Sequence, residues 1–73
     1  MPAGPKGKLE LKEIGLRIRR LRGELLQDEL AAYLNISQGQ LSKIEGGRIA
    51  PTLDTVAKIA EKYNVSIDWI IYG

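Results

Sequence analysis

The chain has 73 residues, of which 44% are hydrophobic and 27% are charged, and its formal net charge is +2 at pH 7. A chain of this length has room for one small domain with a single core. It contains neither Cys nor His, which excludes disulfides and thiolate metal sites and removes the commonest general base, so we expect no metal, no cofactor and no enzymatic activity.

Residues 1–8 read MPAGPKGK and combine Pro, Gly and Lys without apolar periodicity. This composition predicts a flexible basic tail, followed by one domain over residues 9–73. The tail lacks the apolar segment of a signal peptide, and no later apolar run approaches the ~20 residues of a membrane span. We therefore expect a soluble cytoplasmic protein with no membrane partner.

A helical pattern begins near Leu9 and continues to about Gly23, where the glycine is expected to end the helix. Its apolar positions recur every three or four residues, at Ile14, Ile18, Leu21 and Leu25. The same segment carries four arginines, Arg17, Arg19, Arg20 and Arg22. Such a cluster is either a solvated helix face or a source of phosphate contacts, and the motif that follows favours phosphate contacts for some of them.

The stretch from Gln27 to Glu45, QDELAAYLNISQGQLSKIE, predicts two short helices joined by a tight turn. Asn35 is the expected pivot, because Asn tolerates the left-handed backbone conformation that such a break requires. Ser37 can then cap the second helix, and Gln40 returns the contact three residues later, as in a capping box. The expected helices cover residues 27–34 and 38–45.

The remaining sequence predicts two more helices. Gly46 and Gly47 suit the end of the preceding helix, since glycine readily adopts the left-handed conformation. Thr52 is the expected cap of a fourth helix that ends at Asn64, and Ser66 caps a short fifth helix. The fourth helix carries apolar residues on one side, Leu53, Val56, Ile59 and Ala60. No useful β alternation is present, so the prediction is a compact all-α domain of five helices.

The paired helices resemble the helix-turn-helix of the phage repressor and Cro family of DNA-binding domains, the XRE-type family. The resemblance is carried by Gln27, Leu30-Ala31, Asn35-Ile36-Ser37 and the run from Leu41 to Gly47, and flanking segments extend it to roughly residues 14–71. It implies a lambda-repressor-like fold. One departure is a shorter connection before the motif, which places Leu26 where the family has a capping Ser or Thr.

In such domains the second helix of the motif, called the recognition helix, lies in the DNA major groove, with its N-terminal residues facing base edges. Glutamine presents an acceptor and two donors in one plane, as the reading of adenine requires, and lysine can donate to guanine or to phosphate. The candidate base contacts are Gln38, Gly39, Gln40, Ser42 and Lys43. Gly39 either admits close approach of the backbone to a base or is merely tolerated; the sequence favours neither interpretation.

Other residues are candidates for contacts with DNA phosphates. Gln27 resembles a family glutamine at a helix N-terminus, where free backbone N–H groups favour an anion. Arg48 follows the recognition helix in a loop whose basic residues reach phosphate in the family. Lys6 and Lys8 of the tail suit an arm that embraces DNA, although a solvated terminus explains them equally well.

The acidic residue Glu45 has a structural interpretation. The family pairs an acid at this position with an arginine of the first helix, which joins the recognition helix to the rest of the domain. The register favours Arg22, and the shortened connection leaves Arg19 and Arg20 as alternatives.

The expected fifth helix holds more apolar bulk than so small a domain buries on one side. Ile67, Ile70 and Ile71 share a face that can close the core. Trp69 and Tyr72 then project elsewhere, and exposed aromatic pairs usually mark an interface. We therefore place a homodimer surface at Trp69, Tyr72 and Ile71. The alternative is that Trp69 folds back and completes the core of a monomer.

Together these features favour a transcription regulator that binds double-stranded DNA sequence-specifically, in particular a repressor that binds a palindromic operator as a homodimer. Two alternatives share the fold. One is an antitoxin-like or other protein-binding module; the polar second helix of the motif favours DNA over it, because a toxin partner would need an added apolar surface. The other is the N-terminal DNA-binding fragment of a larger phage-type repressor, because the last seven residues resemble the end of the DNA-binding half of such repressors.

Overall fold

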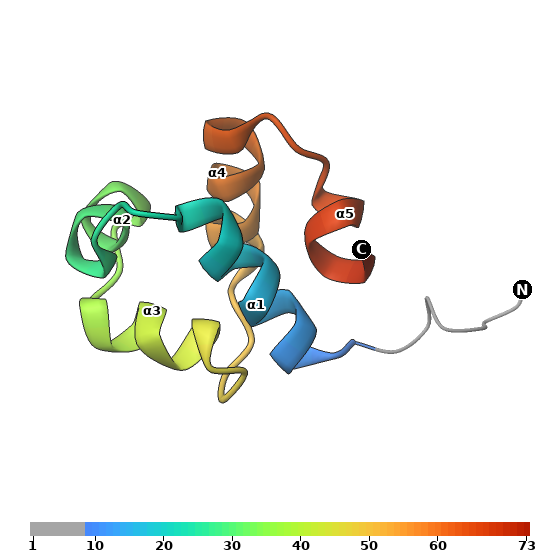
Figure 1. The fold of residues 1–73 in the computed structure, drawn as a ribbon, viewed down its shortest axis with the longest axis horizontal. Coiled ribbons are helices and arrows are strands. Elements are labelled where there is room, and N and C mark those ends of the chain that lie inside the picture. Colours follow the sequence, from blue (N-terminus) through green and yellow to red (C-terminus); the bar gives the residue numbers. More distant parts are fainter. Residues whose placement is uncertain (1–8) are drawn as a thin grey trace, which may run out of the picture.

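The computed structural model describes residues 9–73. The predicted tail, with Lys6 and Lys8, lies outside the described residues. The described part contains five helices and no strand (Figure 1), which confirms the all-α prediction. The helices are α1 (Leu11–Arg22), α2 (Gln27–Leu34), α3 (Gln38–Glu45), α4 (Leu53–Tyr63) and α5 (Ile67–Tyr72). Within this part, no helix is both long and apolar enough to cross a membrane.

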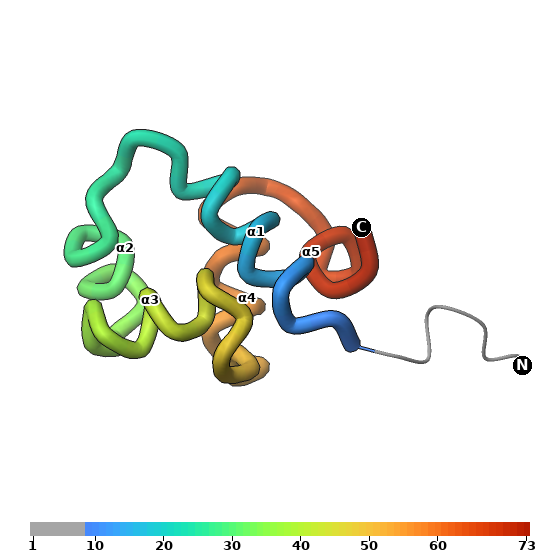
Figure 2. Tube along the Cα trace, turned by 60° about the horizontal axis from the view of Figure 1, so that its bottom comes forward, coloured from blue at the N-terminus to red at the C-terminus, as the bar shows by residue number. Residues whose placement is uncertain are grey.

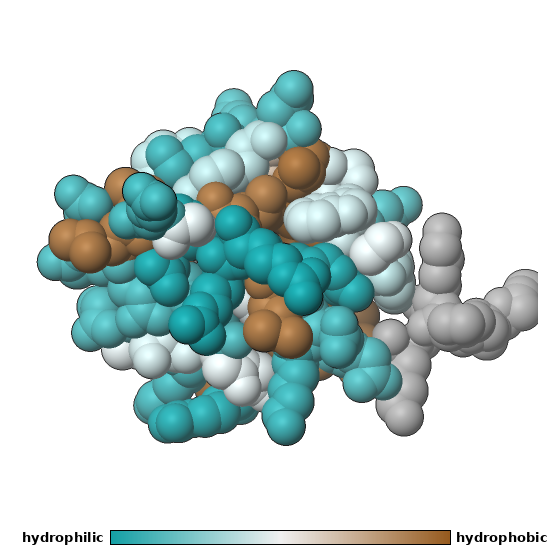
Figure 3. Space-filling view, viewed as in Figure 1, coloured by the Kyte–Doolittle hydropathy of each residue, from teal (hydrophilic) through white to brown (hydrophobic). Residues whose placement is uncertain are grey.

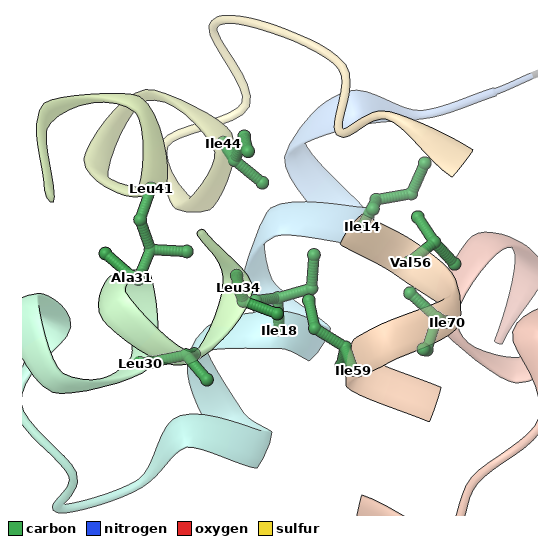
Figure 4. Close-up of a cluster of buried hydrophobic side chains, with 10 residues drawn as sticks. All are labelled: Ile14, Ile18, Leu30, Ala31, Leu34, Leu41, Ile44, Val56, Ile59 and Ile70. Atoms are coloured by element: carbon green, nitrogen blue, oxygen red, sulfur yellow. The ribbon is translucent and has the colours of Figure 1, made fainter. Parts of the chain in front are cut away.

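The helices are arranged around α1. Helices α2 and α3 lie on one side of it and α5 lies on the other, in both views of the chain (Figures 1 and 2). Every helix contributes to one core (Figure 4), which consists of Ile14, Ile18, Leu30, Ala31, Leu34, Leu41, Ile44, Val56, Ile59 and Ile70. Helices of six or eight residues are unstable alone, so this packing is what stabilises them.

The turn between α2 and α3 has the predicted geometry. Asn35 is left-handed, with φ 61° and ψ 42°, and its N–H and that of Ile36 donate to the last carbonyls of α2. The Ser37 Oγ accepts from the Gln40 N–H, and the Gln40 Oε1 accepts from the Ser37 N–H, both at 3.0 Å. This reciprocal pair satisfies two donors that the start of a helix leaves free, so the direction of α3 is fixed at its first residue.

The structure corrects the apolar face expected for α4. Leu53 is 76% exposed, whereas Thr55 is buried beside Val56 and Ile59. Thr55 tolerates burial because its hydroxyl accepts a hydrogen bond from the Thr52 hydroxyl, at 3.1 Å. A satisfied hydroxyl costs little in a core. Leu53 precedes Thr55 by two residues, about 200° around the helix axis, and therefore lies on the solvent side of α4.

Two smaller expectations also differ. Helix α1 begins at Leu11, so Leu9 precedes it and is exposed. Ile67 is 40% exposed and does not close the core; of α5, only Ile70 is fully buried. The predicted glycine end of α3 is confirmed: Gly47 is left-handed, with φ 74°, and Gly46 before it keeps a helical conformation.

Candidate nucleic-acid interface

The structure places the five candidate base contacts on the solvent side of α3. Gln38, Gly39, Gln40, Ser42 and Lys43 are all exposed. Leu41 and Ile44 of the same helix are buried in the core. Hydrophilic residues cover most of the α3 region on the face shown in Figure 3. The outer side of α3 is therefore a row of polar side chains that runs along the whole helix.

A chain of hydrogen bonds joins this row to the domain. The Gln38 Nε2 donates to the Gln27 Oε1 at 2.7 Å, and the Gln27 Nε2 donates to the Glu45 Oε1 at 2.9 Å. The first bond holds one N–H of the Gln38 amide toward Gln27, and the second holds the Gln27 amide toward Glu45. The Gln38 oxygen and one N–H remain for a ligand, as does one N–H of Gln27.

This series of hydrogen bonds ends in an ion pair between α1 and α3. The Arg22 Nε donates to the Glu45 Oε2 at 2.7 Å and the Arg22 Nη2 donates to the Glu45 Oε1 at 3.0 Å. The Glu45 side chain is 4% exposed and that of Arg22 is 15% exposed. The hydrogen bond to Glu45 holds the pKa of Arg22 above its ordinary value, against the lowering effect of burial. Of the three arginines considered from the sequence, Arg22 forms the pair.

Gly15 lets α1 and α3 approach closely, and the sequence analysis did not single it out. A Cβ at this position would lie 2.5 Å from the Glu45 carbonyl oxygen and would collide with that of Ile44. The C-terminal end of α3 therefore rests directly on the backbone of α1. The available signal was a glycine inside a strong helical pattern, where it disfavours the helix by ~1 kcal/mol relative to alanine.

The arginines of α1 have different surroundings. Arg17 is half-buried, and its Nη1 donates to the carbonyl oxygens of Ile70 and Ile71 in α5. It is thus bound within the domain, contrary to a role in phosphate contact. Arg19 is exposed at a hollow beside α3, which is lined by Arg19, Arg22, Gln27, Ser42, Glu45 and Gly46. Its cation, with the free N–H of Gln27 and the Ser42 hydroxyl, gives the hollow donors that suit a phosphate oxygen.

The two ends of the motif carry the remaining candidates. Arg48 is exposed in the loop after α3, and its backbone N–H donates to the Lys43 carbonyl at 2.9 Å, which holds the start of the loop against α3. Leu26 is 61% exposed and supplies no cap, but its N–H donates to the Glu29 Oε1 at 3.2 Å. At the start of α2, only the return bond from the Leu26 N–H to Glu29 is formed, and no side chain at position 26 caps the helix. Gln27 is the first residue of this helix.

The surface of α5 is apolar for a helix at the edge of a small domain. Trp69 and Tyr72 are 39% and 37% exposed, Ile67 is also exposed, and Ile71 is half-buried against the core. The residue of α5 that is buried in the core is Ile70, and Trp69 is not part of that core. Among residues 9–73, no group of acidic side chains is placed to hold a metal ion.

A model of the helix-turn-helix family matches residues 16–70, which is most of the chain and includes α2, α3 and the Arg22–Glu45 ion pair. The chain belongs to the helix-turn-helix (XRE-type) family. Proteins of this family with this fold are DNA-binding transcription regulators and not enzymes. This helix-turn-helix protein is accordingly a DNA-binding transcription regulator.

Solved structures of three regulators have the same fold. The P22 c2 repressor, solved in complex with the synthetic operator 9T, is 24% identical with a TM-score of 0.74, over 82% of this chain and 94% of that one. The restriction-modification controller protein C.AhdI from Aeromonas hydrophila is 24% identical with a TM-score of 0.72, over 84% and 96%. The clp gene regulator ClgR from Corynebacterium glutamicum is 25% identical with a TM-score of 0.74, over 86% and 69%. No curated protein matches the chain.

Proposed function

We propose that this helix-turn-helix protein is a repressor that reads a palindromic operator in double-stranded DNA as a homodimer. The observation that carries the proposal is the hydrogen-bond chain from Arg22 through Glu45 and Gln27 to Gln38. It holds one N–H of the Gln38 amide toward Gln27 before any ligand is present. A fixed reader loses less conformational entropy on binding and discriminates better between bases. The crystal structure of the similar P22 c2 repressor in complex with operator DNA supports a DNA-binding use of this fold.

Gln38 is the principal base reader in this proposal. Its free oxygen and second N–H can accept from adenine N6 and donate to adenine N7 together. Gln40 is less suited to adenine, because its oxygen already accepts from the Ser37 N–H. Lys43, one turn further along α3, can donate to guanine or to a phosphate. Ser42 and Gly39 lie between them on the same exposed side.

The phosphate contacts flank this row. We assign them to Gln27 at the start of α2, to Arg48 after α3 and to Arg19 at the adjoining hollow, because each offers an exposed or partly exposed donor beside the recognition helix. Such contacts position the helix and supply most of the salt-dependent affinity, and they carry no sequence information directly.

The apolar surface of α5 and the size of the site support the proposed homodimer. One recognition helix covers one half-site, and a two-fold dimer places a second one about one turn, ~34 Å, along the duplex. Trp69 and Tyr72 are large, half-exposed aromatics of the kind that form the centre of interfaces.

The experiment for base reading replaces Gln38 with Ala. Binding to a duplex selected from a random pool is expected to weaken by ~1–3 kcal/mol, with the loss confined to one base pair of each half-site. The melting temperature should stay within about 3 °C of the parent, since the side chain is exposed. Gel shifts on duplexes substituted at single base pairs, together with thermal unfolding, provide both measurements.

A matched control for Gln38→Ala is Gln40→Ala, which removes the capping bond at the start of α3. This variant should lose ~1 kcal/mol of stability and show a smaller change in base preference. If Gln38→Ala binds every duplex less tightly by the same factor, Gln38 contacts phosphate and the assignment as base reader is wrong.

Replacing Trp69 and Tyr72 singly with Ala tests the dimer surface. Each change is expected to raise the dimer dissociation constant by at least about tenfold, because exposed aromatic anchors dominate interfaces of this kind. Leu53→Ala is the control, since Leu53 is more exposed and lies on α4. Sedimentation equilibrium measures the association. A parent that remains monomeric at millimolar concentration would exclude a free dimer.

A further inference from the structure

Arg17 joins α1 to the C-terminal end of α5. Its Nη1 donates to the Ile70 carbonyl at 2.9 Å and to the Ile71 carbonyl at 3.2 Å. The Gly73 N–H donates to the Trp69 carbonyl at 2.9 Å. Three of the last four carbonyls of α5 thus have donors, and two of those three depend on Arg17. The helix has no basic residue of its own in its last turn.

These bonds fix more than the distance between the two helices. Successive carbonyls of a helix are about 100° apart around its axis. A donor that holds two of them at once therefore sets how far α5 is rotated about that axis. A helix of six residues has little stability of its own, so its rotation is determined by such contacts and by the burial of Ile70.

The same α1 helix also fixes the recognition helix. Gly15 and Arg17 lie on opposite flanks of the buried stripe formed by Ile14 and Ile18, given ~100° per residue. Gly15 rests against the C-terminal carbonyls of α3, and Arg22 binds Glu45. The 12-residue helix α1 therefore contacts both α3 and α5 and links their orientations, while α4 also packs against α5.

We propose that Arg17 is a positioning residue that determines the spacing between the two operator half-sites. The inference rests on the proposed homodimer through α5. In such a dimer, the rotation of α5 sets the direction in which Trp69 and Tyr72 face the partner, and hence where the second recognition helix lies on the duplex. A fixed α5 selects one spacing, whereas an α5 free to rotate accepts several.

The test compares the parent with Arg17→Met, which keeps an unbranched side chain and removes the donors. Arg20→Met is the matched control, because Arg20 is an exposed arginine of the same helix. Each protein is titrated with duplexes that carry two copies of the selected half-site at a series of separations, and with a duplex that carries one copy. The spacing profile is a readout that a general loss of stability does not change.

The parent is expected to bind its best spacing about tenfold more tightly than spacings altered by two base pairs, since a rigid dimer cannot follow the rotation of the groove. For Arg17→Met the difference should fall to about threefold or less, and the affinity for a single half-site should equal that of the parent. Arg20→Met should keep the parental profile.

The outcomes separate the two proposals. A sharp parental profile that Arg17→Met retains overturns the role of Arg17 and leaves the homodimer in place. A parent that binds paired and single half-sites equally well overturns the homodimer, and the spacing role with it. If Arg17→Met fails to fold, Arg17→Gln decides, because the shorter amide cannot span both carbonyls: a broadened profile is expected, and a parental profile overturns the inference.

Discussion

Replacing Arg22 with Met is expected to bring the domain close to unfolding. The change leaves the Glu45 carboxylate buried with only the Gln27 amide as a partner, and an unpaired buried charge costs about 3–5 kcal/mol. A domain of 73 residues has a total stability of roughly 4–11 kcal/mol. The melting temperature should therefore fall by about 15–30 °C, measured by circular dichroism.

The double variant Arg22→Met, Glu45→Met separates charge from packing. Apolar residues of similar size often replace a buried pair without net loss, so more than half of the lost stability should return. DNA binding should not return with it, because Gln27 loses the carboxylate that orients it toward Gln38. Arg20→Met serves again as the exposed control. A single Arg22→Met variant that melts within about 5 °C of the parent would show that the pair contributes little.

The helix-turn-helix itself was predictable because its signals are local. The bounds of α2 and α3 match the predicted ranges, since Asn35 adopts the left-handed conformation and Ser37 and Gln40 cap each other within four residues. The pairing of Glu45 with an arginine of α1 came from the family resemblance. The register expected from the sequence favoured Arg22 and left Arg19 and Arg20 as alternatives, and in the structure Arg22 forms the pair with Glu45, 23 residues further along the chain.

What the sequence did not reveal depends on distant backbone. Arg17 looks like one cation of a cluster until the carbonyls of α5, more than 50 residues away, are placed beside it. Thr55 looks exposed and Leu53 looks buried, because hydrophobicity alone ignores the bond between the Thr52 and Thr55 hydroxyls. Gly15 gives no hint of its neighbour, since a glycine's role is to leave room for something else.

Gly15→Ala and Gly39→Ala are expected to change stability in opposite directions, although both put the same methyl group on a helix. At Gly15 the methyl meets two backbone carbonyl oxygens of α3, which cannot move aside as a side chain would. The clash costs about 3 kcal/mol, which exceeds the ~1 kcal/mol that alanine contributes through helix propensity. We expect a melting temperature lower by roughly 10 °C.

At Gly39 the nearest atom to the added methyl is the Ser37 Oγ, at 3.9 Å, so nothing opposes the gain in propensity. Gly39→Ala should raise the melting temperature by about 4–8 °C. DNA affinity then distinguishes the two glycines further. Gly15→Ala should weaken binding to every duplex, because it displaces the C-terminal end of α3. A Gly39→Ala variant that is more stable yet binds its operator less tightly would show that the bare backbone at this position lies against a base. If both variants shift the melting temperature in the same direction, the close approach of α1 to α3 is not what Gly15 provides.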